Sequence, residues 1–584
     1  MQFFTSQTST LSAIPLAEHW QTALVSALIL WLGAYGLTKL ARKYIWVPKY
    51  TIMDDLPNFG KARTDGTLGS RAVICGGSFG GLFAAAMCSF HFDSVVIIEP
   101  EGTASDQSID KHKSHEVRVA ADGLQRAIPL RTRVVQYLAS HIFLPITLKF
   151  MRQMFPKLDD ELKYFGVSTI PNVVEGYQGS VELIKPYKAT DKGAVHIFPT
   201  SRALFETLVR RLVFTYRANV TFIQGTVDKF ERSKEDPTKL SGVSFKTPQG
   251  DRFEKASFIV DATGVAQVSY NKLLKSAGFG NSLPTKIEYE PHLNYSQTVW
   301  TLPPDLIPGL TKIIPAGMKG TFYANLPDWS TGENRACYIS FYDNTSLCIA
   351  FGALGGNEKP HTIPDIRVSI QSLHGDGNPP EFIGKILDFL EEHEDDCTPW
   401  VYDANTGKMH NIPYHEAPEA LPSNWVAIGD AVTKLNPIYG QGTTKAAIEV
   451  VTLDSILRAI PAAQGIPADL PKKYYTKRAP RVLGLWYVSW GLSPLTEPDH
   501  TYLSDFREAT KASDYSYATT QPGKGETNET GAYIRKLGLK MVEAGCHDLA
   551  MARSFYSVQV CLAPPTDLLA PSIVAKVAKK WIMG

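Results

Sequence analysis

The sequence predicts an α/β protein with four parts: an apolar N-terminal helix, a parallel sheet, an antiparallel sheet domain and a helical C-terminal region. Two strand–glycine turn–helix units predict the parallel sheet, one from Arg71 to Met87 and one from Trp425 to Val450. Between residues 285 and 415, alternating residues with many aromatics predict an antiparallel sheet that turns one face to an apolar pocket. The two sheet domains are interleaved, because the parallel-sheet units lie on both sides of this region.

Length and composition exclude several classes of protein. The chain has 584 residues, which suggests two to four domains, and a formal net charge of +1. Nucleic-acid binding would call for a clearly basic face, so nucleic acid is not an expected partner. The 7 cysteines are odd in number, scattered and without a Cys-x-x-Cys pair. They are typical of reduced thiols in a cytosol-facing domain, and they predict neither a disulfide framework nor a metal site.

A run of 19 uncharged residues, Trp20 to Thr38, is followed by four basic residues, Lys39, Arg42, Lys43 and Lys49. At about 1.5 Å per residue, this run is long enough to cross the roughly 30 Å hydrocarbon core of a bilayer. Because the positive charges follow the run, we expect a single-pass anchor, at the endoplasmic reticulum, with the bulk of the chain in the cytosol. A secretory signal is one alternative, although no basic residue precedes the run and no cleavage site stands out, and a buried amphipathic helix is the other. The N-terminal region then divides into a tail (1–19), an anchor (20–40) and a linker (41–69).

The first glycine turn reads Gly76-x-Ser78-x-x-Gly81, between an apolar strand and a small-residue helix, and a second strand ends at Glu99. This is a dinucleotide-binding βαβ pattern, in which glycines let the backbone meet a pyrophosphate and an acid about 20 residues on binds the ribose. Ser78 stands where a glycine is expected. An acid at position 99 favours a free 2′-hydroxyl, as in the ADP half of FAD, over NADP. The alternative is a glycine-rich turn without a ligand.

Two later fragments complete the pattern. The strand Trp425–Ile428 ends in Gly429-Asp430, and a turn with Pro437, Gly440 and Gly442 leads into a helix that Thr443 or Thr444 caps. A helix N-terminus offers N–H donors to a reduced flavin, and the carboxylate suits a ribityl hydroxyl better than a phosphate. Between the two units, a buried strand from Ser257 ends in Asp261-Ala-Thr-Gly264.

These three fragments, in this order, resemble the single-Rossmann FAD-dependent monooxygenases of the para-hydroxybenzoate hydroxylase superfamily. Ser201-Arg202-Ala-Leu-Phe-Glu206, Tyr270 to Gly278 and Asn436-Pro-Ile-Tyr439 are most similar to the lasalocid-type olefin epoxidases. The resemblance spans roughly residues 70 to 490 and implies a Rossmann-type FAD-binding domain of the β-β-α-β variant. It implies that FAD is bound by Gly76, Gly77, Ser78, Phe79, Gly80, Gly81, Glu99, Arg202, Asp261, Gly264, Gly429, Asp430, Pro437, Gly440 and Gly442.

Two points of this resemblance stay open. The segment Ile128 to Arg133 matches poorly where bacterial epoxidases approach the flavin, so either Arg131 or Arg133 could contact the flavin, and a solvated basic turn is equally compatible. Arg202 corresponds to an arginine near the ribityl and phosphate region, with an ordinary surface arginine as the alternative. No residue is assigned as a catalytic acid or base.

The resemblance also implies the chemistry. Reduced FAD reacts with O2 to a C4a-hydroperoxide, whose outer oxygen passes to the substrate, and NAD(P)H visits transiently as reductant because no second nucleotide-binding unit is present. Together with the membrane segment, it implies epoxidation of a lipophilic polyketide or terpenoid in secondary metabolism. Aromatic hydroxylation and a non-redox role as cyclase or binding scaffold are the alternatives. Halogenation would require a Trp-x-Trp-x-Ile-Pro segment, which is absent.

The domain boundaries follow from these motifs. We expect the FAD-binding domain in two parts, 70–284 and 416–480, with the substrate-binding sheet domain at 285–415 between them. The remaining residues, 481–584, form the helical C-terminal region.

Overall fold

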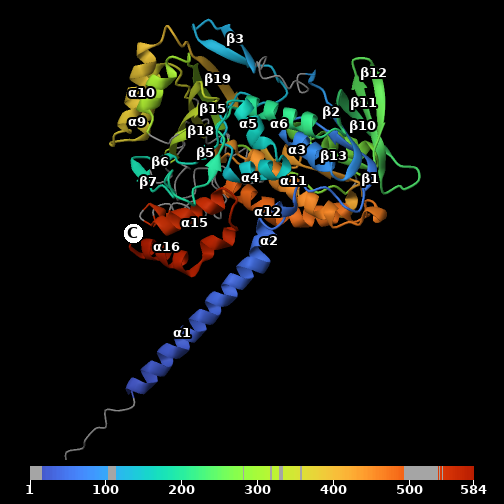
Figure 1. The fold of residues 1–584 in the computed structure, drawn as a ribbon, viewed down its shortest axis with the longest axis horizontal. Coiled ribbons are helices and arrows are strands. Elements are labelled where there is room, and N and C mark those ends of the chain that lie inside the picture. The colour runs from blue at the N-terminus through green and yellow to red at the C-terminus, as the bar shows by residue number, and fades with distance from the viewer. Residues whose placement is uncertain are drawn as a thin grey trace, which may run out of the picture.

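The computed structural model describes residues 16–584 except 103–113, 281, 292, 316–318, 328–332, 334, 355–357, 492–536, 538–539, 542–543, 547 and 584. Figure 1 shows a two-part body in which the parallel-sheet half and the antiparallel-sheet half lie side by side, while a long N-terminal helix extends away from it. The predicted class, a parallel Rossmann-type sheet combined with separate antiparallel sheets, is confirmed.

The parallel sheet has five strands in the order β21-β13-β1-β2-β9. Their bounds are β1 Gly69–Cys75, β2 Phe92–Glu99, β9 Val220–Gln224, β13 Phe258–Asp261 and β21 Trp425–Ala427. Every neighbouring pair is parallel, and β1, the central strand, is fully buried from Ala72 to Cys75. Strands buried on both faces read as continuous apolar runs, which is why the sequence revealed them. Since all five strands run the same way, the residues that follow them meet at one edge.

Helices cover this sheet and complete the core. They are α3 (Phe79–Cys88), α6 (Arg202–Tyr216), α11 (Gly442–Arg458) and α12 (Leu470–Gly491), with α4 (Pro145–Met154) and α5 (Leu158–Tyr164) beside them. α3 packs against both α6 and α11, and α11 packs against α12. The small residues Ala84, Ala85 and Ala86 of α3 are fully buried. Their size lets the helix approach the sheet closely, so the glycine turn is held against the strand ends.

The second large sheet has nine strands, in the order β3-β4-β19-β15-β18-β17-β16-β6-β7. Five strands come from the predicted range: β15 Leu293–Thr301, β16 Gly320–Leu326, β17 Arg335–Tyr342, β18 Ser346–Leu354 and β19 Trp400–Asn405. The other four come from earlier in the chain: β3 His115–Val119, β4 Gln125–Pro129, β6 Glu175–Gln178 and β7 Val181–Leu183. The sheet is therefore mixed, because β4 joins β19 and β6 joins β16 in parallel. It extends beyond residues 285–415.

The remaining elements of the body are smaller sheets and further helices. One small sheet is formed by β10 (Thr226–Arg232), β11 (Leu240–Thr247) and β12 (Gly250–Lys255), and another by β14 (Ile287–Tyr289), β20 (Met409–Asn411) and β22 (Thr433–Lys434). β5 (Ile170–Pro171) pairs with β8 (His196–Ile197). The helices α8 (Ile307–Ile313), α9 (Ile363–Leu373) and α10 (Glu381–Glu392) belong to the antiparallel half, and α7 (Leu274–Ser276) follows β13.

The N-terminal helix α1 (Leu16–Ala41) continues through a π-helical turn, Arg42–Trp46, into α2 (Val47–Tyr50). Within the part of the chain that the structure describes, no helix is both long and apolar enough to cross a bilayer. A helix at the predicted place is thus confirmed, whereas the predicted transmembrane span over residues 20–38 is not. The region predicted as linker packs onto the body, because Ile52, Leu56, Phe59 and Leu68 are buried in its core.

The C-terminal region is helical where it is described. α15 (Leu549–Gln559) and α16 (Pro571–Met583) flank a short 3-10 turn, Pro565–Leu569, and lie below the antiparallel half (Figure 1). α15 contacts the body through Tyr556, whose hydroxyl accepts a 2.6 Å hydrogen bond from Asn172.

Candidate functional site

One cavity of about 550 Å³ lies where the strand ends of the parallel sheet face the antiparallel sheet. Its size is in the range of small-molecule and cofactor sites. Residues from all three predicted fragments line it: Gly76, Ser78, Phe79, Gly80, Glu99, Arg202, Gly264, Gly429, Asp430, Pro437, Gly440 and Gly442. Gly77, Gly81 and Asp261 belong to the predicted set but do not line the cavity. Folding therefore brings together segments that are far apart in the sequence.

The first glycine turn needs its glycines for close packing. Gly76 has φ +111°, and a Cβ on it would lie 2.3 Å from the carbonyl oxygen of Ala262. A Cβ on Gly81 would lie 1.8 Å from the carbonyl oxygen of Gly76. No side chain fits at either distance, so these two positions hold the turn between β13 and α3. The turn in consequence presents Ser78 and the first residues of α3 to the cavity.

Glu99, at the end of β2, is buried on the cavity wall. Its Oε2 accepts a 2.7 Å hydrogen bond from the N–H of Gly77, and its Oε1 accepts one of 3.2 Å from the N–H of Glu101. The guanidinium of Arg131 lies 3.1 Å from Oε1. A carboxylate has roughly four acceptor positions, so about one remains for a ligand hydroxyl. These three contacts hold the carboxylate of Glu99 in place on the cavity wall.

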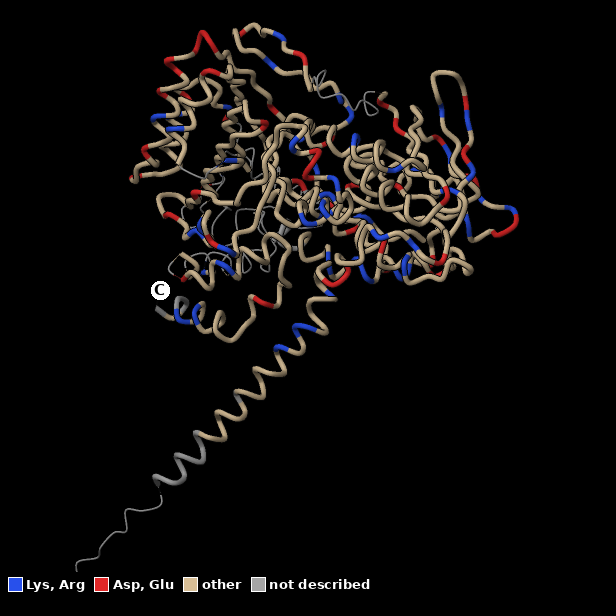
Figure 2. The backbone as a smooth tube through the Cα atoms, viewed as in Figure 1, with Lys and Arg blue, Asp and Glu red and all other residues tan. Residues whose placement is uncertain are grey.

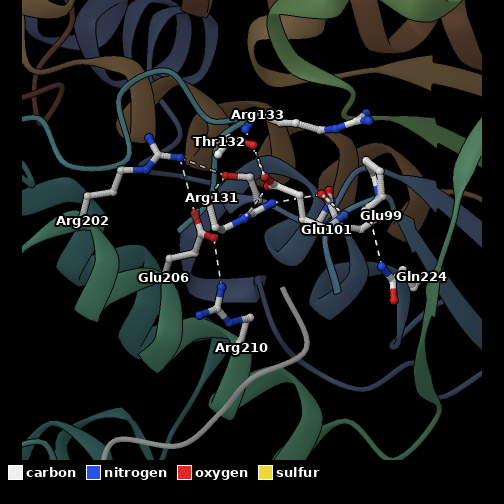
Figure 3. Close-up of polar contacts among 12 residues, drawn as sticks. Glu99, Glu101, Arg131, Thr132, Arg133, Arg202, Glu206, Arg210 and Gln224 are labelled. Atoms are coloured by element: carbon white, nitrogen blue, oxygen red, sulfur yellow. Dashed lines mark hydrogen bonds and ion pairs between the residues drawn. The ribbon is translucent and has the colours of Figure 1, made fainter. Parts of the chain in front are cut away.

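Arg131 is the centre of a buried ionic cluster (Figure 3). It binds Glu99, Glu101 at 3.0 Å, and Glu206. Burial lowers the pKa of Arg131, but Glu206, Glu99 and Glu101 outweigh it, so the pKa is raised and the guanidinium stays charged. Arg131 is thus a partner of the acid at position 99, and both Arg131 and the exposed Arg133 line the cavity.

Ser78 connects this cluster to the cavity. Its hydroxyl donates to Glu206 at 3.0 Å and accepts from Arg202 at 2.9 Å. Burial raises the pKa of Glu206, but Arg131, Arg202 and Arg210 outweigh it and lower the pKa, so the acid is ionised. A glycine at position 78 would remove one hydrogen-bond partner from each of two buried charges. That gives a physical reason for the departure from the usual glycine.

Arg202 lines the cavity beside the start of α3. Its guanidinium lies over the ring of Phe79, 4.9 Å from the centroid, and its Nε is buried without a hydrogen-bond partner. Burial lowers its pKa, although Glu206 opposes this shift. An arginine in this state favours an anionic group in the adjoining cavity, and it is not the ordinary surface arginine that the sequence left open.

Asp261 has a supporting position. Its Oδ1 accepts the N–H of Thr263 at 2.9 Å and the hydroxyl of Thr263 at 2.7 Å, and burial raises its pKa. The aspartate closes the turn after β13, and this turn places Gly264 (φ +67°) on the cavity wall. Of the two residues predicted at this fragment, Gly264 lines the cavity and Asp261 does not.

Asp430 faces the cavity, because its side chain is 42% exposed there, and it pairs at 2.7 Å with the fully buried Lys445. Burial raises the pKa of Asp430, but Lys445 outweighs it and lowers the pKa, so the acid is a carboxylate. The imidazole Nε2 of His410 lies 2.7 Å from the carbonyl oxygen of Asp430. Burial lowers the pKa of His410 to about 4, so it is neutral at pH 7 and donates this bond.

Two helix N-termini open onto the cavity without side-chain caps. Neither Ser78 before α3 nor Gln441 before α11 makes a capping hydrogen bond, and neither helix has an acid in its first turn. Gly440 (φ +64°) turns the chain into α11, whose first residues Gly442 and Thr443 line the cavity. Free N–H groups and positive dipole ends at two places in one cavity suit a ligand with two anionic groups.

The antiparallel sheet forms the far wall, chiefly with Tyr295, Tyr338 and Phe351. Gln297 in β15 fixes the covering segment, because its Oε1 accepts from the N–H of Ser140 and its Nε2 donates to Leu138, both at 2.7 Å. The neighbouring His141 lines the cavity, and burial lowers its pKa to about 3. Apart from such isolated polar groups this wall is apolar and aromatic, as predicted.

The supporting residues were not all visible in the sequence. Lys445 lies three residues after Gly442, and Glu449, which accepts the N–H of Gly429 at 2.6 Å, lies on the same helix. The helical spacing of apolar residues predicts which positions of this helix face the sheet, and a charged residue at such a position indicates a buried ion pair. These two residues could have been found in the sequence in this way. Among the residues that the structure describes, no cluster of His, Cys, Asp and Glu has the arrangement of a metal site.

Comparisons with known proteins give the following. No protein-family model matches the chain, and no curated protein matches it. Solved structures match at low identity. A flavin-dependent brominase, Bmp2, is 14% identical with a TM-score of 0.47, over 88% of this chain and 99% of that one. PqsL, a probable FAD-dependent monooxygenase from Pseudomonas aeruginosa, is 13% identical with a TM-score of 0.47, over 77% and 98%. A flavoprotein/dehydrogenase from Cytophaga hutchinsonii is 11% identical with a TM-score of 0.48, over 88% and 98%. These TM-scores are below 0.5, so we base no functional assignment on them.

Proposed function

We propose that the cavity binds FAD and that the protein is an FAD-dependent monooxygenase. One observation carries the proposal: three glycine-and-acid fragments, starting near residues 76, 261 and 429, line a single cavity that two uncapped helix N-termini face. A dinucleotide with a diphosphate and a redox-active ring requires this combination of donors at two places and carboxylates between them. If the first fragment were only a glycine-rich turn without a ligand, there would be no reason for the other two fragments to line the same cavity.

The residues fit such a ligand in order along the cavity. The start of α3, with Ser78 and Arg202, would hold the diphosphate, and Glu99 would accept a ribose hydroxyl. Asp430, a carboxylate kept charged by Lys445, would accept a ribityl hydroxyl. The start of α11 at Gly442 would place N–H donors beside the ring system and stabilise negative charge there.

The reaction would combine the cofactor's chemistry with the protein's pocket. FAD held in this cavity would supply the activation of O2, with NAD(P)H as the transient reductant. The chain's own residues would hold an apolar substrate against Tyr295, Tyr338 and Phe351 and exclude water from the cavity. This lining supports a lipophilic polyketide or terpenoid alkene as substrate and its epoxide as product. Aromatic hydroxylation requires only a different substrate in the same pocket.

We also propose that the N-terminal helix associates with a bilayer, at the endoplasmic reticulum, with the catalytic body on the cytosolic side. In support, large apolar side chains of α1 are exposed along its length, including Ile29 (63%), Leu30 (73%) and Leu37 (69%). Such a run of uncovered apolar surface is unfavourable in water. A lipophilic substrate would then be available from the membrane.

The first experiment is an absorption spectrum of the purified protein before and after anaerobic NADPH or NADH. Two visible bands of oxidised flavin are expected, together with substrate-dependent oxygen uptake when alkenes are supplied. Products formed under ¹⁸O₂ should gain one labelled oxygen atom. A protein that binds no FAD would refute the cofactor proposal. A product with unchanged mass would instead favour a cyclase or binding scaffold.

A further inference from the structure

The C-terminal helix α16 has an apolar face that the body does not cover. Ile573 and Val577 point inward, where they pack with Met551 of α15. On the other side, Val574 (48% exposed) and Ile582 (84% exposed) are in contact with solvent. These positions are spaced by four or eight residues, together with Ala578, and therefore lie on one helix face.

This helix is tied to the base of the N-terminal helix. Arg42, in the turn that follows α1, donates to both carboxylate oxygens of Asp567 at 2.9 to 3.1 Å. Asp567 lies in the turn directly before α16, and the exposed Leu569 (67%) follows it. Figure 1 shows α16 and the base of α1 on the same side of the body. Chain segments 525 residues apart thus contribute to one side of the molecule.

The two chain segments on this side are rich in basic residues. From Trp20 to Met53 the sequence contains no acid but has Lys39, Arg42, Lys43 and Lys49, and from Pro571 to Gly584 it contains no acid but three lysines. Figure 2 shows blue segments at the base of α1 and in α16. Two acids beside α16 are paired, Asp567 with Arg42 and Asp548 with Lys576. An apolar helix face with lysines beside it complements an anionic lipid surface.

We propose that the outer face of α16, with Val574, Ala578, Lys579 and Ile582, lies in the headgroup region of an anionic bilayer. This goes beyond the anchoring proposed for α1, because it gives the body a second, surface-bound contact. Two contacts, one at each end of the chain, fix the orientation of the body on the membrane. The Arg42–Asp567 pair joins these contacts mechanically.

The test uses photo-cross-linking of the full-length protein in phosphatidylcholine vesicles, with or without phosphatidylserine. Ile582→benzoylphenylalanine is expected to give lipid adducts, detected by mass spectrometry. The matched control is Val368→benzoylphenylalanine, an equally apolar and exposed site (70%) on α9, which is expected to give none. The proposal would be overturned if position 582 formed adducts only with another protein chain. It would also be overturned if lipid adducts at position 582 were no more abundant than at position 368.

A charge variant tests the lipid class. In phosphatidylserine vesicles, Lys579→Gln should lower the yield of lipid adducts from position 582 about fivefold, since one cation near an anionic surface contributes about 1 kcal/mol. Lys385→Gln, on the distant helix α10, should leave the yield unchanged. An equal yield for Lys579→Gln and the unsubstituted chain would overturn the assignment to anionic lipid. These readouts do not depend on flavin content or on activity.

Discussion

Glu99→Gln should weaken FAD binding while leaving FMN binding nearly unchanged. Glu99 uses three acceptor positions for Gly77, Glu101 and Arg131, at 2.7, 3.2 and 3.1 Å, so a ribose hydroxyl would take the position that remains. A hydrogen bond to a charged group contributes about 1.5–3 kcal/mol, which corresponds to roughly 10- to 150-fold in Kd. FMN has no adenosine ribose, so its affinity does not depend on this carboxylate.

The assay is a titration of apo-protein with FAD or FMN, followed by flavin fluorescence. Glu101→Gln is the matched control, because Glu101 binds the same guanidinium of Arg131 at 3.0 Å but does not line the cavity. We expect Glu101→Gln to change Kd for FAD much less than Glu99→Gln does. Equal losses in the two variants, or an equal loss for FMN, would refute the assignment of Glu99 to the ribose.

Three further predictions concern the support of the site. Gly81→Ala should lower the free energy of unfolding by about 1–3 kcal/mol or more, because the added Cβ would overlap the carbonyl of Gly76. Gly442→Ala is the control, because no atom lies within 4 Å of the added Cβ. Thermal unfolding of the apo-protein should show a loss of stability for the first variant and little change for the second. Lys445→Met should lower the free energy of unfolding by about 1–3 kcal/mol, because the carboxylate of Asp430, which is 42% exposed, loses its cation. Adding Asp430→Asn to this variant should restore part of the loss, and a double variant no more stable than Lys445→Met would contradict the reasoning. The pKa of His410 is about 6.5 in the unfolded chain, and burial lowers it to about 4 in the folded protein, so between these values the unfolded state binds more protons. The free energy of unfolding should therefore fall by about 3 kcal/mol as the pH is lowered from 6.5 to 4. In chemical denaturation, His410→Gln should depend less on pH over this range.

The parts of the site that are local in sequence were predictable. The turn after β1 requires glycine at positions 76 and 81, because a Cβ at either position would lie 2.3 Å or less from a backbone carbonyl oxygen, and the sequence shows this requirement directly as two glycines. Buried parallel strands are equally local, since each appears as a short apolar run, and Glu99 follows one such run. For these reasons the fold class could be predicted, and most of the predicted site residues do line the cavity.

The network around Arg131 could not be predicted in the same way. Position 131 left a flavin contact and a solvated turn equally open, and only the packed structure shows that it is buried among Glu99, Glu101 and Glu206. The exception at Ser78 has the same origin, since its hydroxyl bonds to Glu206, 128 residues away. Long-range ion pairs have no sequence period, because the partners come from different elements.

The sequence by itself determined the parallel sheet, the order of the three glycine-and-acid fragments and a helix near the N-terminus. These features depend on steric limits and on the spacing of apolar residues, which act over a few neighbouring positions. Only the tertiary structure decided that four early strands join the antiparallel sheet, that Asp261 supports the cavity from behind, and that Arg42 meets Asp567. Each of these depends on which distant surfaces bury each other, and burial is a property of the whole folded chain.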